Sequence, residues 1–299
     1  MDTDWTKHLY AFDVIVVRHA ESFNNTLYDQ IRKILGPEYT EEDFVKEEMK
    51  LRQPDSDLST RGYEQTKKLR SFLANGGWSN IVKDKKSWLA LSSPMKRCLL
   101  TSDAIHTGLG VPVTVDPELY ETGGAFDENG IALPGISEAE VLATYPGYTC
   151  IDGMQNGFFS SHELQESNAE FDERAYHLSE RLWGLFMDSV EKQKRGEPDF
   201  LNGVILVAHG NLLSAIINCL LTQSRSPRVG LFIHENSGFS HIELHLEDVS
   251  GRKSIAMKQM NDYAHLMGDH DSSTSSNPMR CGNHTTNDHW IQEFFVKKA

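Results

Sequence analysis

The chain has 299 residues, of which 39% are hydrophobic and 24% are charged. This composition is typical of a globular protein with a sizeable core and excludes a disordered chain. Because 43 acidic residues outweigh 29 basic ones, the formal net charge is -14, and neither nucleic acid nor a membrane is expected as a partner. A small anionic substrate remains compatible with that charge, since the local field of a pocket can oppose the net charge.

The chain shows no pattern of a targeting or membrane-spanning segment. No apolar run reaches the ~18 residues of a membrane helix, and MDTDWTKHLYAFD at the N-terminus lacks a basic start followed by an apolar core. The four cysteines lie far apart without a CxxC pair, which favours free thiols. We therefore expect a cytoplasmic protein whose thiols stay reduced.

The first half of the chain predicts two strands, each followed by a helix. Residues 14–17 form a short apolar run rich in β-branched residues, as in a strand covered on both faces. A charged and largely helical insertion follows at residues 26–54. The helix predicted at residues 60–74 opens with hydroxyl residues and stops at NGG. Residues 88–93 are a weaker strand candidate, and a helix is expected at 95–107.

The second half continues the alternation after a weak strand candidate near residue 114. Residues 123–168 mix glycine, proline and aromatic residues without periodicity, which suggests a second insertion. Apolar residues recur at spacings of three and four over residues 168–194, which predicts a long amphipathic helix. A buried strand is predicted at 203–208 and a helix at 211–221. Strands that alternate with helices predict an α/β protein with helices on both sides of the sheet.

The last residues, 268–299, are polar and rich in Ser, Thr and Asn, and we expect a polar C-terminal tail. A cysteine and several histidines recur there and just before it at zinc-like spacing, namely His265, His270, Cys281, His284 and His289. No second cysteine pair completes a four-ligand set. A tail that happens to contain histidines is the preferred interpretation, so no metal site is predicted.

Charged residues follow the predicted strands at the points where the strands end. Arg18 and His19 come directly after the first strand, and His209 follows the strand that ends in VAHGN. Arg97 lies in the first turn of a predicted helix, where free backbone N–H groups favour an anion. Ligands of parallel sheets collect at the carboxyl ends of strands. Two arginines and two histidines there would form a site for an anion the size of phosphate.

A histidine in such a site can attack phosphorus. Neutral imidazole has a lone pair near neutral pH, and a covalent phosphohistidine divides one difficult displacement into two easier ones. The leaving oxygen then needs a proton. Glu121, which follows a predicted strand and leads into a glycine-rich loop, is the leading candidate for the general acid, and Glu118 is a weaker one. Any one of these residues alone would more simply be a hydrogen-bonded or surface residue.

The order of the motifs resembles the histidine phosphatase superfamily, the phosphoglycerate-mutase-like proteins. The resemblance is carried by VVRHAESFNN, DSDLSTRG, SSPMKRCLLTSDA, LYETGG and VAHGN, and it extends to NSGFSHIEL and NDYAHL. It covers residues 13–266, with the two insertions matched poorly. It implies an α/β fold, a three-layer α/β/α sandwich with a mostly parallel central sheet, and a reaction through a phosphohistidine without metal or cofactor.

The resemblance also implies a role for individual residues. It makes His19 the nucleophile, His209 the second pocket histidine and Glu121 the general acid. The implied phosphate- or substrate-binding residues are Arg18, Ser22, Asn25, Arg97 and Gly210. We accordingly expect a single catalytic domain at residues 1–267, followed by the tail.

Two departures from the family pattern bear on function. Ala20 stands where the family usually has glycine, and we expect the motif to tolerate alanine unless the position needs a positive φ. Phosphoglycerate mutases carry an ERHYG-like stretch that helps to hold their substrate, whereas this chain has ETGGA. The missing basic and aromatic residues favour hydrolysis over transfer to a second hydroxyl.

We therefore expect a metal-independent phosphomonoester hydrolase that acts on a phosphorylated small molecule or a phosphoprotein. Two alternatives stay open. One is a phosphotransferase of the mutase type, and the other is a non-catalytic binding or scaffolding protein that kept the fold.

Overall fold

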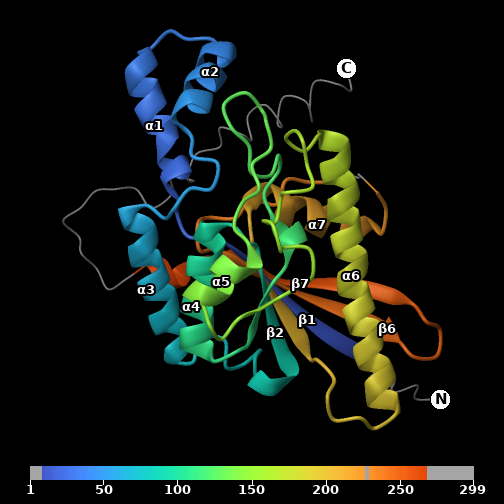
Figure 1. Cartoon of the computed structure of the whole chain (residues 1–299). Coiled ribbons are helices and arrows are strands. Elements are labelled where there is room, and N and C mark those ends of the chain that lie inside the picture. The colour runs from blue at the N-terminus through green and yellow to red at the C-terminus, as the bar shows by residue number, and fades with distance from the viewer. Residues whose placement is uncertain (1–8, 226–228, 268–299) are drawn as a thin grey trace.

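The centre of the molecule is a seven-stranded sheet with the strand order β4-β3-β2-β5-β1-β6-β7 (Figure 1). The structure is a computed structural model, and it describes residues 9–225 and 229–267. The strands are β1 (Leu9–Arg18), β2 (Trp88–Ser92), β3 (Val113–Val115), β4 (Thr149–Cys150), β5 (Gly203–Ala208), β6 (Phe239–Glu247) and β7 (Lys253–Asp262). The strands from β4 to β1 run parallel, whereas β6 and β7 are antiparallel to their neighbours.

The helices lie on both faces of the sheet. They are α1 (Phe23–Leu35), α2 (Glu41–Leu51), α3 (Thr60–Ala74), α4 (Lys96–Leu109), α5 (Glu138–Thr144), α6 (Asn168–Lys194) and α7 (Gly210–Thr222). Short 3-10 turns occur at Lys85–Ser87, Pro117–Leu119 and Ala264–Leu266. Helices α3 and α4 pack on one face, and α6 and α7 pack on the other. The predicted three-layer α/β/α sandwich with a mostly parallel sheet is confirmed.

Burial on both faces explains why β1 and β5 could be predicted. All of β5 is buried, and the side chains of β1 alternate between the two cores, with Ile15 facing α3 and α4 and Val14 facing α6 and α7. Such a strand must be apolar along its whole length. Arg18 pairs with Ala208, so β1 and β5 end side by side.

The antiparallel strands β6 and β7 were not predicted from the sequence. Ile242 and Leu244 of β6 are buried in the core beneath α6 and α7, while His241 and Glu243 alternate with them and face the other side of the sheet. Half of the strand is therefore polar, and no continuous apolar run marks it. The pairing with β6 also explains why β1 begins at Leu9, ahead of the predicted start.

The insertion predicted at residues 26–54 is a pair of helices, α1 and α2, which projects beyond the main body of the molecule (Figure 1). Its own small core contains Leu27, Ile31 and Phe44. Helix α1 begins at Phe23, earlier than expected, because Ser22 acts as its N-cap. The insertion at 123–168 holds only α5, β4 and irregular chain. The predicted tail lies outside the described residues.

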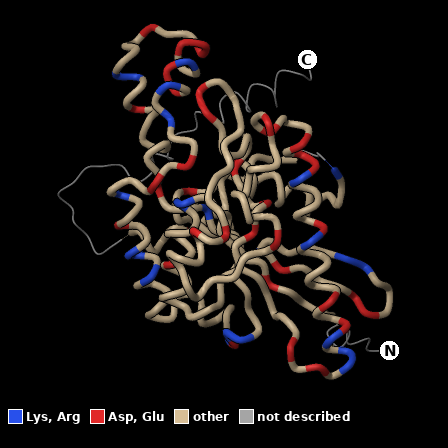
Figure 2. Tube along the Cα trace, in the orientation of Figure 1, with Lys and Arg blue, Asp and Glu red and all other residues tan. Residues whose placement is uncertain are grey.

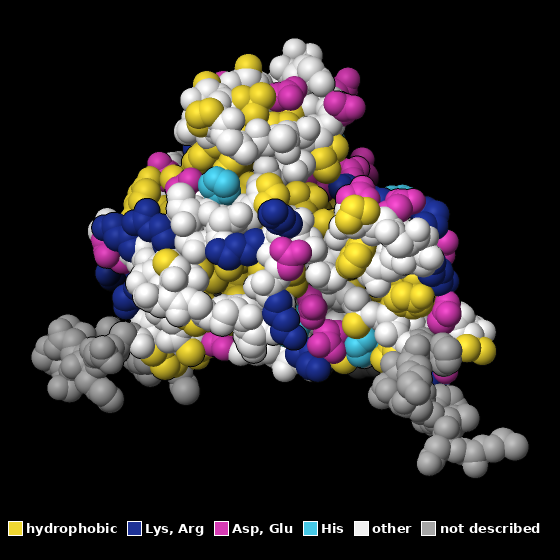
Figure 3. All heavy atoms as spheres, turned by 90° about the horizontal axis from the view of Figure 1, so that it is seen from below, with side chains coloured by type: hydrophobic (Ala, Val, Ile, Leu, Met, Phe, Trp, Pro, Cys, Tyr) yellow, Lys and Arg dark blue, Asp and Glu magenta, His cyan; other side chains and the backbone are white. Residues whose placement is uncertain are grey.

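Charge is spread over the molecule rather than segregated. Acidic residues occur on helices and loops throughout the chain trace (Figure 2). Seen from below the view of Figure 1, basic side chains lie among acidic ones (Figure 3). Among the described helices, we find none with the length and apolar character needed to cross a membrane.

Candidate active site

The predicted site residues meet at the carboxyl ends of the parallel strands. His19 follows β1 and His209 follows β5, and their ring centroids lie 5.2 Å apart. Arg97, in the first turn of α4, donates from Nε to His19 Nε2 over 3.3 Å. The strand pairing thus brings together residues that lie far apart in the sequence, at the edge where ligands of parallel sheets bind.

His19 is held as a neutral imidazole in which one nitrogen is unprotonated. The ring is buried, and its Nδ1 lies 2.7 Å from the carbonyl oxygen of Ala20. Only a protonated Nδ1 can donate to that carbonyl, and Arg97 donates toward Nε2, so Nε2 carries the lone pair. Burial lowers the pKa of His19 well below its usual value, and the charges of Arg97 and Arg18 lower it further.

His209 is completely buried beside His19. Its Nε2 lies 2.8 Å from Ser93 Oγ and 3.5 Å from Cys98 Sγ. Burial lowers the pKa of His209 well below its usual value, and the charges of Arg97 and His19 lower it further. Burial also raises the pKa of the Cys98 thiol to about 12, so this cysteine is not a thiolate nucleophile at neutral pH.

The two arginines are oriented by different contacts. Arg18 donates from Nη1 to the backbone oxygen of His234 over 2.6 Å. Arg97 Nη1 lies 4.0 Å from Asp55 Oδ1, and the same oxygen accepts from the backbone N–H of Lys96 over 3.0 Å. A guanidinium carries five N–H donors in a planar fork, so both arginines are suited to bind oxygens of an anion.

Ser22 and Asn25 lie at the start of α1 and bind each other. Ser22 Oγ donates to Asn25 Oδ1 over 3.0 Å and accepts from the Asn25 backbone N–H, which makes a capping box. The Nδ2 group of Asn236 bridges this cap and the end of β1, since it lies 3.2 Å from Asn25 Oδ1 and 3.1 Å from the His19 backbone oxygen. The predicted phosphate contacts of Ser22 and Asn25 would therefore come from residues that also hold the site together.

The structure answers the question raised by Ala20. Among the described residues, the non-glycine residues with positive φ are Gln223, Ser237 and Asn261, so Ala20 needs no left-handed backbone. Its N–H donates to Thr101 Oγ1 over 3.0 Å. Gly210 also has an ordinary φ, and a Cβ there would lie 3.5 Å from Arg18 Nε. A side chain longer than alanine at position 210 would therefore crowd Arg18.

Glu121 lies at the same sheet edge, next to the N-terminus of α7. Its carboxylate accepts from the backbone N–H groups of Leu212 over 3.3 Å and Asn211 over 3.4 Å. A further N–H group, that of Thr122, donates to it over 3.0 Å. These contacts point the carboxyl group toward the site. The weaker candidate, Glu118, instead pairs with Arg181 at 2.6 Å on the surface.

A buried ion pair holds the loop that carries Glu121. Arg174 and Glu166 form two hydrogen bonds of 2.6 and 2.7 Å, and both side chains are buried. Arg174 also donates to the backbone oxygen of Tyr120 over 3.0 Å, while Glu166 accepts from the N–H of Gly123 over 3.3 Å. The backbone is thus anchored on both sides of Glu121. Neither anchoring residue belongs to a motif that the sequence analysis used.

The site opens into a pocket of about 470 Å³. His19, Arg18, Arg97 and Glu121 line it at the sheet edge, and residues of both insertions and of the segment 231–234 before β6 line much of the rest. His209 lies behind His19 and does not line it. Pockets of this size typically hold a small molecule. Arg52 and Phe126, the residues of the insertions that contact each other in the pocket wall, were not predicted as site residues because neither insertion carries a recognised motif.

Other missed residues did lie within quoted motifs. Asp55, Ser93 and Asn236 belong to DSDLSTRG, SSPMKRC and NSGFSHIEL. A polar residue in a motif next to a strand end can be picked out from the sequence as a candidate site residue. Its hydrogen-bond partner, however, depends on which strands pair, and the sequence alone does not show this.

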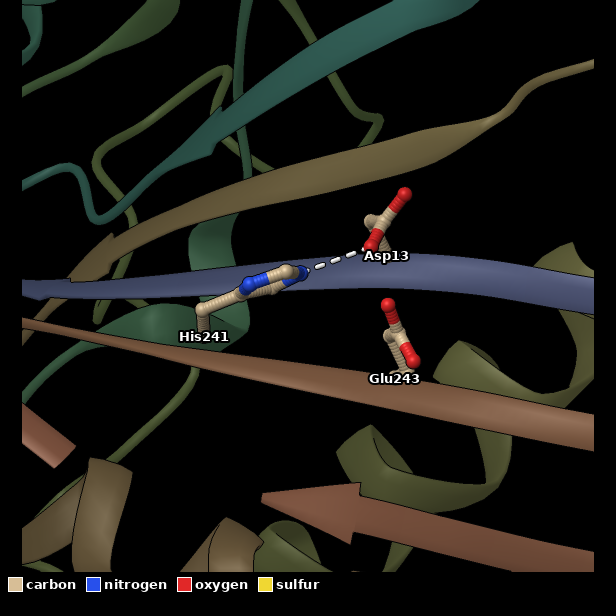
Figure 4. A group of neighbouring side chains, drawn as sticks. All are labelled: Asp13, His241 and Glu243. Carbon is tan, nitrogen blue, oxygen red and sulfur yellow. Dashed lines mark hydrogen bonds and ion pairs between the residues drawn. The ribbon is translucent and has the colours of Figure 1, made fainter. Parts of the chain in front are cut away.

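Among the described residues, Asp13, His241 and Glu243 form a group that could hold a metal ion (Figure 4). They lie on β1 and β6, away from the carboxyl end of β1 where His19 lies. His241 Nε2 is 2.6 Å from Asp13 Oδ1, and Glu243 is 3.1 Å from Lys258 and 3.2 Å from His245. Since a hydrogen bond to His241 engages Asp13 and an ion pair with Lys258 engages Glu243, a metal would have to displace these contacts. The predicted zinc-like residues after His265 lie outside the described part of the chain.

Comparison with known proteins gives a family match and several distant structures. A mycobacterial glucosyl-3-phosphoglycerate phosphatase is 18% identical, with a TM-score of 0.46, and the match covers 84% of this chain and 99% of the other. An ecdysone phosphate phosphatase from Bombix mori is 14% identical, with a TM-score of 0.49, and the match covers 89% of this chain and 98% of the other. A phosphoserine phosphatase from Entamoeba histolytica is 17% identical, with a TM-score of 0.41, and the match covers 85% of this chain and 99% of the other. These distant likenesses carry no functional argument. No curated protein matches the chain.

The family match is much more specific. A family model described as "Histidine phosphatase superfamily (branch 1)" matches residues 14–253. That range runs from β1 to the start of β7 and contains every predicted site residue. The resemblance noted from the motifs is therefore confirmed, and the chain belongs to branch 1 of the histidine phosphatase superfamily.

Proposed function

We propose that this protein is a metal-independent phosphomonoester hydrolase that acts through a phosphohistidine on His19. The observation that carries the proposal is the state of His19 itself. Its Nδ1 faces a carbonyl oxygen at 2.7 Å, its Nε2 faces an arginine, and its pKa is lowered by burial. A neutral imidazole with its free nitrogen directed at an anion site is suited to attack phosphorus.

In the first step, the lone pair of His19 Nε2 forms a bond to phosphorus while the bond from phosphorus to the ester oxygen breaks. The leaving oxygen takes a proton from the carboxylic acid form of Glu121. Arg18 and Arg97 bind the phosphoryl oxygens and stabilise the charge that develops on them. The Nδ1–H of His19, held by the carbonyl of Ala20, keeps the ring oriented during attack.

In the second step, water attacks the phosphohistidine. The Glu121 carboxylate takes a proton from the water as the bond from phosphorus to Nε2 breaks. Inorganic phosphate then leaves, and the neutral imidazole of His19 is restored. His209 supports both steps as a neutral neighbour with its Nε2 directed at Ser93. No atom in this cycle requires a metal ion.

The substrate proposed is a phosphorylated small molecule, because the pocket of about 470 Å³ matches a small ligand. The insertions at 26–54 and 123–168 form the part of the pocket away from His19 and would determine which molecule fits. The chain up to residue 267 would thus act as one catalytic domain.

The test is hydrolysis of phenyl phosphate in the presence of a chelator, with trapping of the phosphoenzyme. We expect wild-type turnover to survive the chelator and His19→Ala to lose at least ~10³-fold in kcat/KM. The exposed His177 on α6 offers a matched control, so His177→Ala should retain activity and form the same acid-labile phosphoenzyme.

Other outcomes would support other functions. Activity that depends on an added divalent metal would contradict the phosphohistidine mechanism. Exchange between 2- and 3-phosphoglycerate without hydrolysis would favour the mutase alternative. A scaffold would show no turnover in any of these assays and no phosphoenzyme.

A further inference from the structure

Arg52 occupies an unusual position in the pocket wall. It is the C-cap residue of α2, and its backbone N–H donates to the oxygen of Glu48. Its side chain reaches across to the other insertion, where the guanidinium carbon lies 3.9 Å from the ring centroid of Phe126. Arg52 therefore joins the two insertions and lines the same pocket as His19.

The charge of Arg52 is only partly compensated. Its Nη1 donates to the backbone oxygen of Phe126 over a long 3.3 Å, and within the described residues no carboxylate oxygen lies within 4.0 Å of it. Burial lowers the pKa of Arg52 to about 10. The negative charge of Glu48 acts to raise this pKa, and the positive charge of Arg97 lowers it by a smaller amount. Charged side chains that leave water are normally paired.

A purely structural role explains this position less well. Glu48 lies one helical turn before Arg52 and also lines the pocket, yet the two side chains form no ion pair. Burial raises the pKa of Glu48, so its carboxylate is itself poorly solvated. The contact with the Phe126 ring and the hydrogen bond to the Phe126 backbone oxygen engage one face and one N–H group of a guanidinium that carries five N–H donors.

The pocket that Arg52 shares with the phosphate site is lined by both polar and apolar side chains. Phe44 and Met49 of α2, Phe126 of the second insertion and Phe232 before β6 supply apolar surface. A few charged groups in such a pocket determine how a ligand is oriented. Arg18 and Arg97 line it at the edge of the sheet, and Arg52 lines it from the end of α2.

We propose that Arg52 binds a second anionic group of the substrate, and that the substrates are phosphomonoesters that also carry a carboxylate or a second phosphate. This inference rests on the proposed function, since it takes the phosphoryl group to lie at His19. A planar guanidinium suits such a group because it can pair with two oxygens at once. Lys96, the other cation near Arg97, is exposed and does not line the pocket.

The test is equilibrium binding of phosphonates that cannot be hydrolysed, measured by calorimetry. The probes are ω-carboxyalkyl phosphonates of rising chain length and their methyl esters, with alkane bisphosphonates as a second arm. At the chain length that spans the pocket, we expect wild type to bind the acid about tenfold or more tightly than its ester. Arg52→Gln should lose that preference, and Arg52→Lys should keep part of it.

Arg32 on α1 gives a matched control, because it lies in the same insertion, is exposed and does not line the pocket. Arg32→Gln should keep the full preference for the acid. Equal binding of acid and ester by wild type at every length would overturn the proposal, as would a preference that survives in Arg52→Gln. Tighter binding of bisphosphonates than of carboxylates would identify a second phosphate as the natural group.

The two proposals can fail separately. Binding of phosphonates needs no turnover, so a preference that depends on Arg52 would stand even if phenyl phosphate were not hydrolysed. Conversely, hydrolysis that depends on His19, combined with no preference for the acid probes, would leave the proposed function intact and remove the role of Arg52.

Discussion

At the scale of single residues, the site depends on how the protonation of His19 is controlled. The carbonyl of Ala20 selects the tautomer, while burial and two arginines disfavour the charged ring. A cationic site would ordinarily be hard to combine with a histidine that must stay neutral. Here the same arginines that would bind phosphate also help burial to keep His19, the proposed nucleophile, unprotonated.

The first prediction concerns the titration of His19. Because its pKa in the folded protein is lowered well below 6.5, the ring should remain the neutral Nδ1–H tautomer when the pH falls through 6.5. Nitrogen-15 NMR of the imidazole measures this directly. In denaturant the same ring should titrate near its ordinary value of ~6.5. A folded-state titration at that ordinary value would contradict the electrostatic account.

The second prediction concerns Glu121 as the proton donor. Glu121→Gln should lower kcat/KM by ~10²-fold or more for an alkyl phosphate, whose leaving oxygen needs a proton. The loss should be much smaller for p-nitrophenyl phosphate, whose leaving group is stable as an anion. Glu118→Gln is the control, since Glu118 is half exposed and pairs with Arg181. An equal loss for both substrates would mean that Glu121 does not donate the proton.

At the scale of elements, the position of α3 depends on a close approach to the chain that follows His19. A Cβ added to Gly62 would collide with the backbone oxygen of Glu21, two residues after His19. The carboxylate of Glu21 in turn accepts from Ser59 Oγ, the N-cap residue of α3, over 2.6 Å. The start of this helix is therefore packed directly against the chain that leaves β1.

The third prediction compares two glycines within helices. Gly62→Ala should lower the free energy of unfolding by about 1–3 kcal/mol because the backbone of Glu21 must move. Gly184→Ala in α6 should raise it by up to ~1 kcal/mol, since a Cβ there meets no atom within 4 Å and alanine favours helix. Urea unfolding measures both. Similar effects of the two substitutions would show that helix propensity alone decides.

At the scale of the whole molecule, stability should depend on histidines buried without charge. His234 is 1% exposed, and burial lowers its pKa to about 4. His19 and His209 are buried with pKa values lowered in the same direction. An unfolded histidine binds its proton near ~6.5, so below that pH the unfolded state binds more protons than the folded state.

The fourth prediction follows from this imbalance. Stability contributed by these histidines should be complete above pH 6.5 and fall as the pH drops toward 4. In His234→Gln, whose amide can still bind Ser240, the slope between those values should be smaller by up to ~1.4 kcal/mol per pH unit. Denaturant titrations at several pH values measure the slope. An unchanged slope would show that His234 stays uncharged in the unfolded state as well, or titrates normally when folded.

The sequence was sufficient for the elements and motifs whose pattern is local. The strand at 203–208 and the helices at 60–74 and 168–194 have the predicted bounds, because their apolar pattern and caps lie within the element itself. Strands β6 and β7 were missed because their pairing with distant strands decides which face is buried. The site residues were predicted from motifs near strand ends, and their roles in catalysis stay predictions.

By itself, the sequence determined the family, the fold class and the residue types at the ends of β1 and β5, because these depend on short patterns in a given order. Only the tertiary structure decided how those residues are arranged and which contacts they make. The contact from Arg97 to His19 spans 78 positions in the chain. The neutral state of His19, the position of Glu121 at the start of α7 and the partly compensated charge of Arg52 arise from neighbours brought together by packing, and burial and hydrogen bonding exist only once the chain has folded.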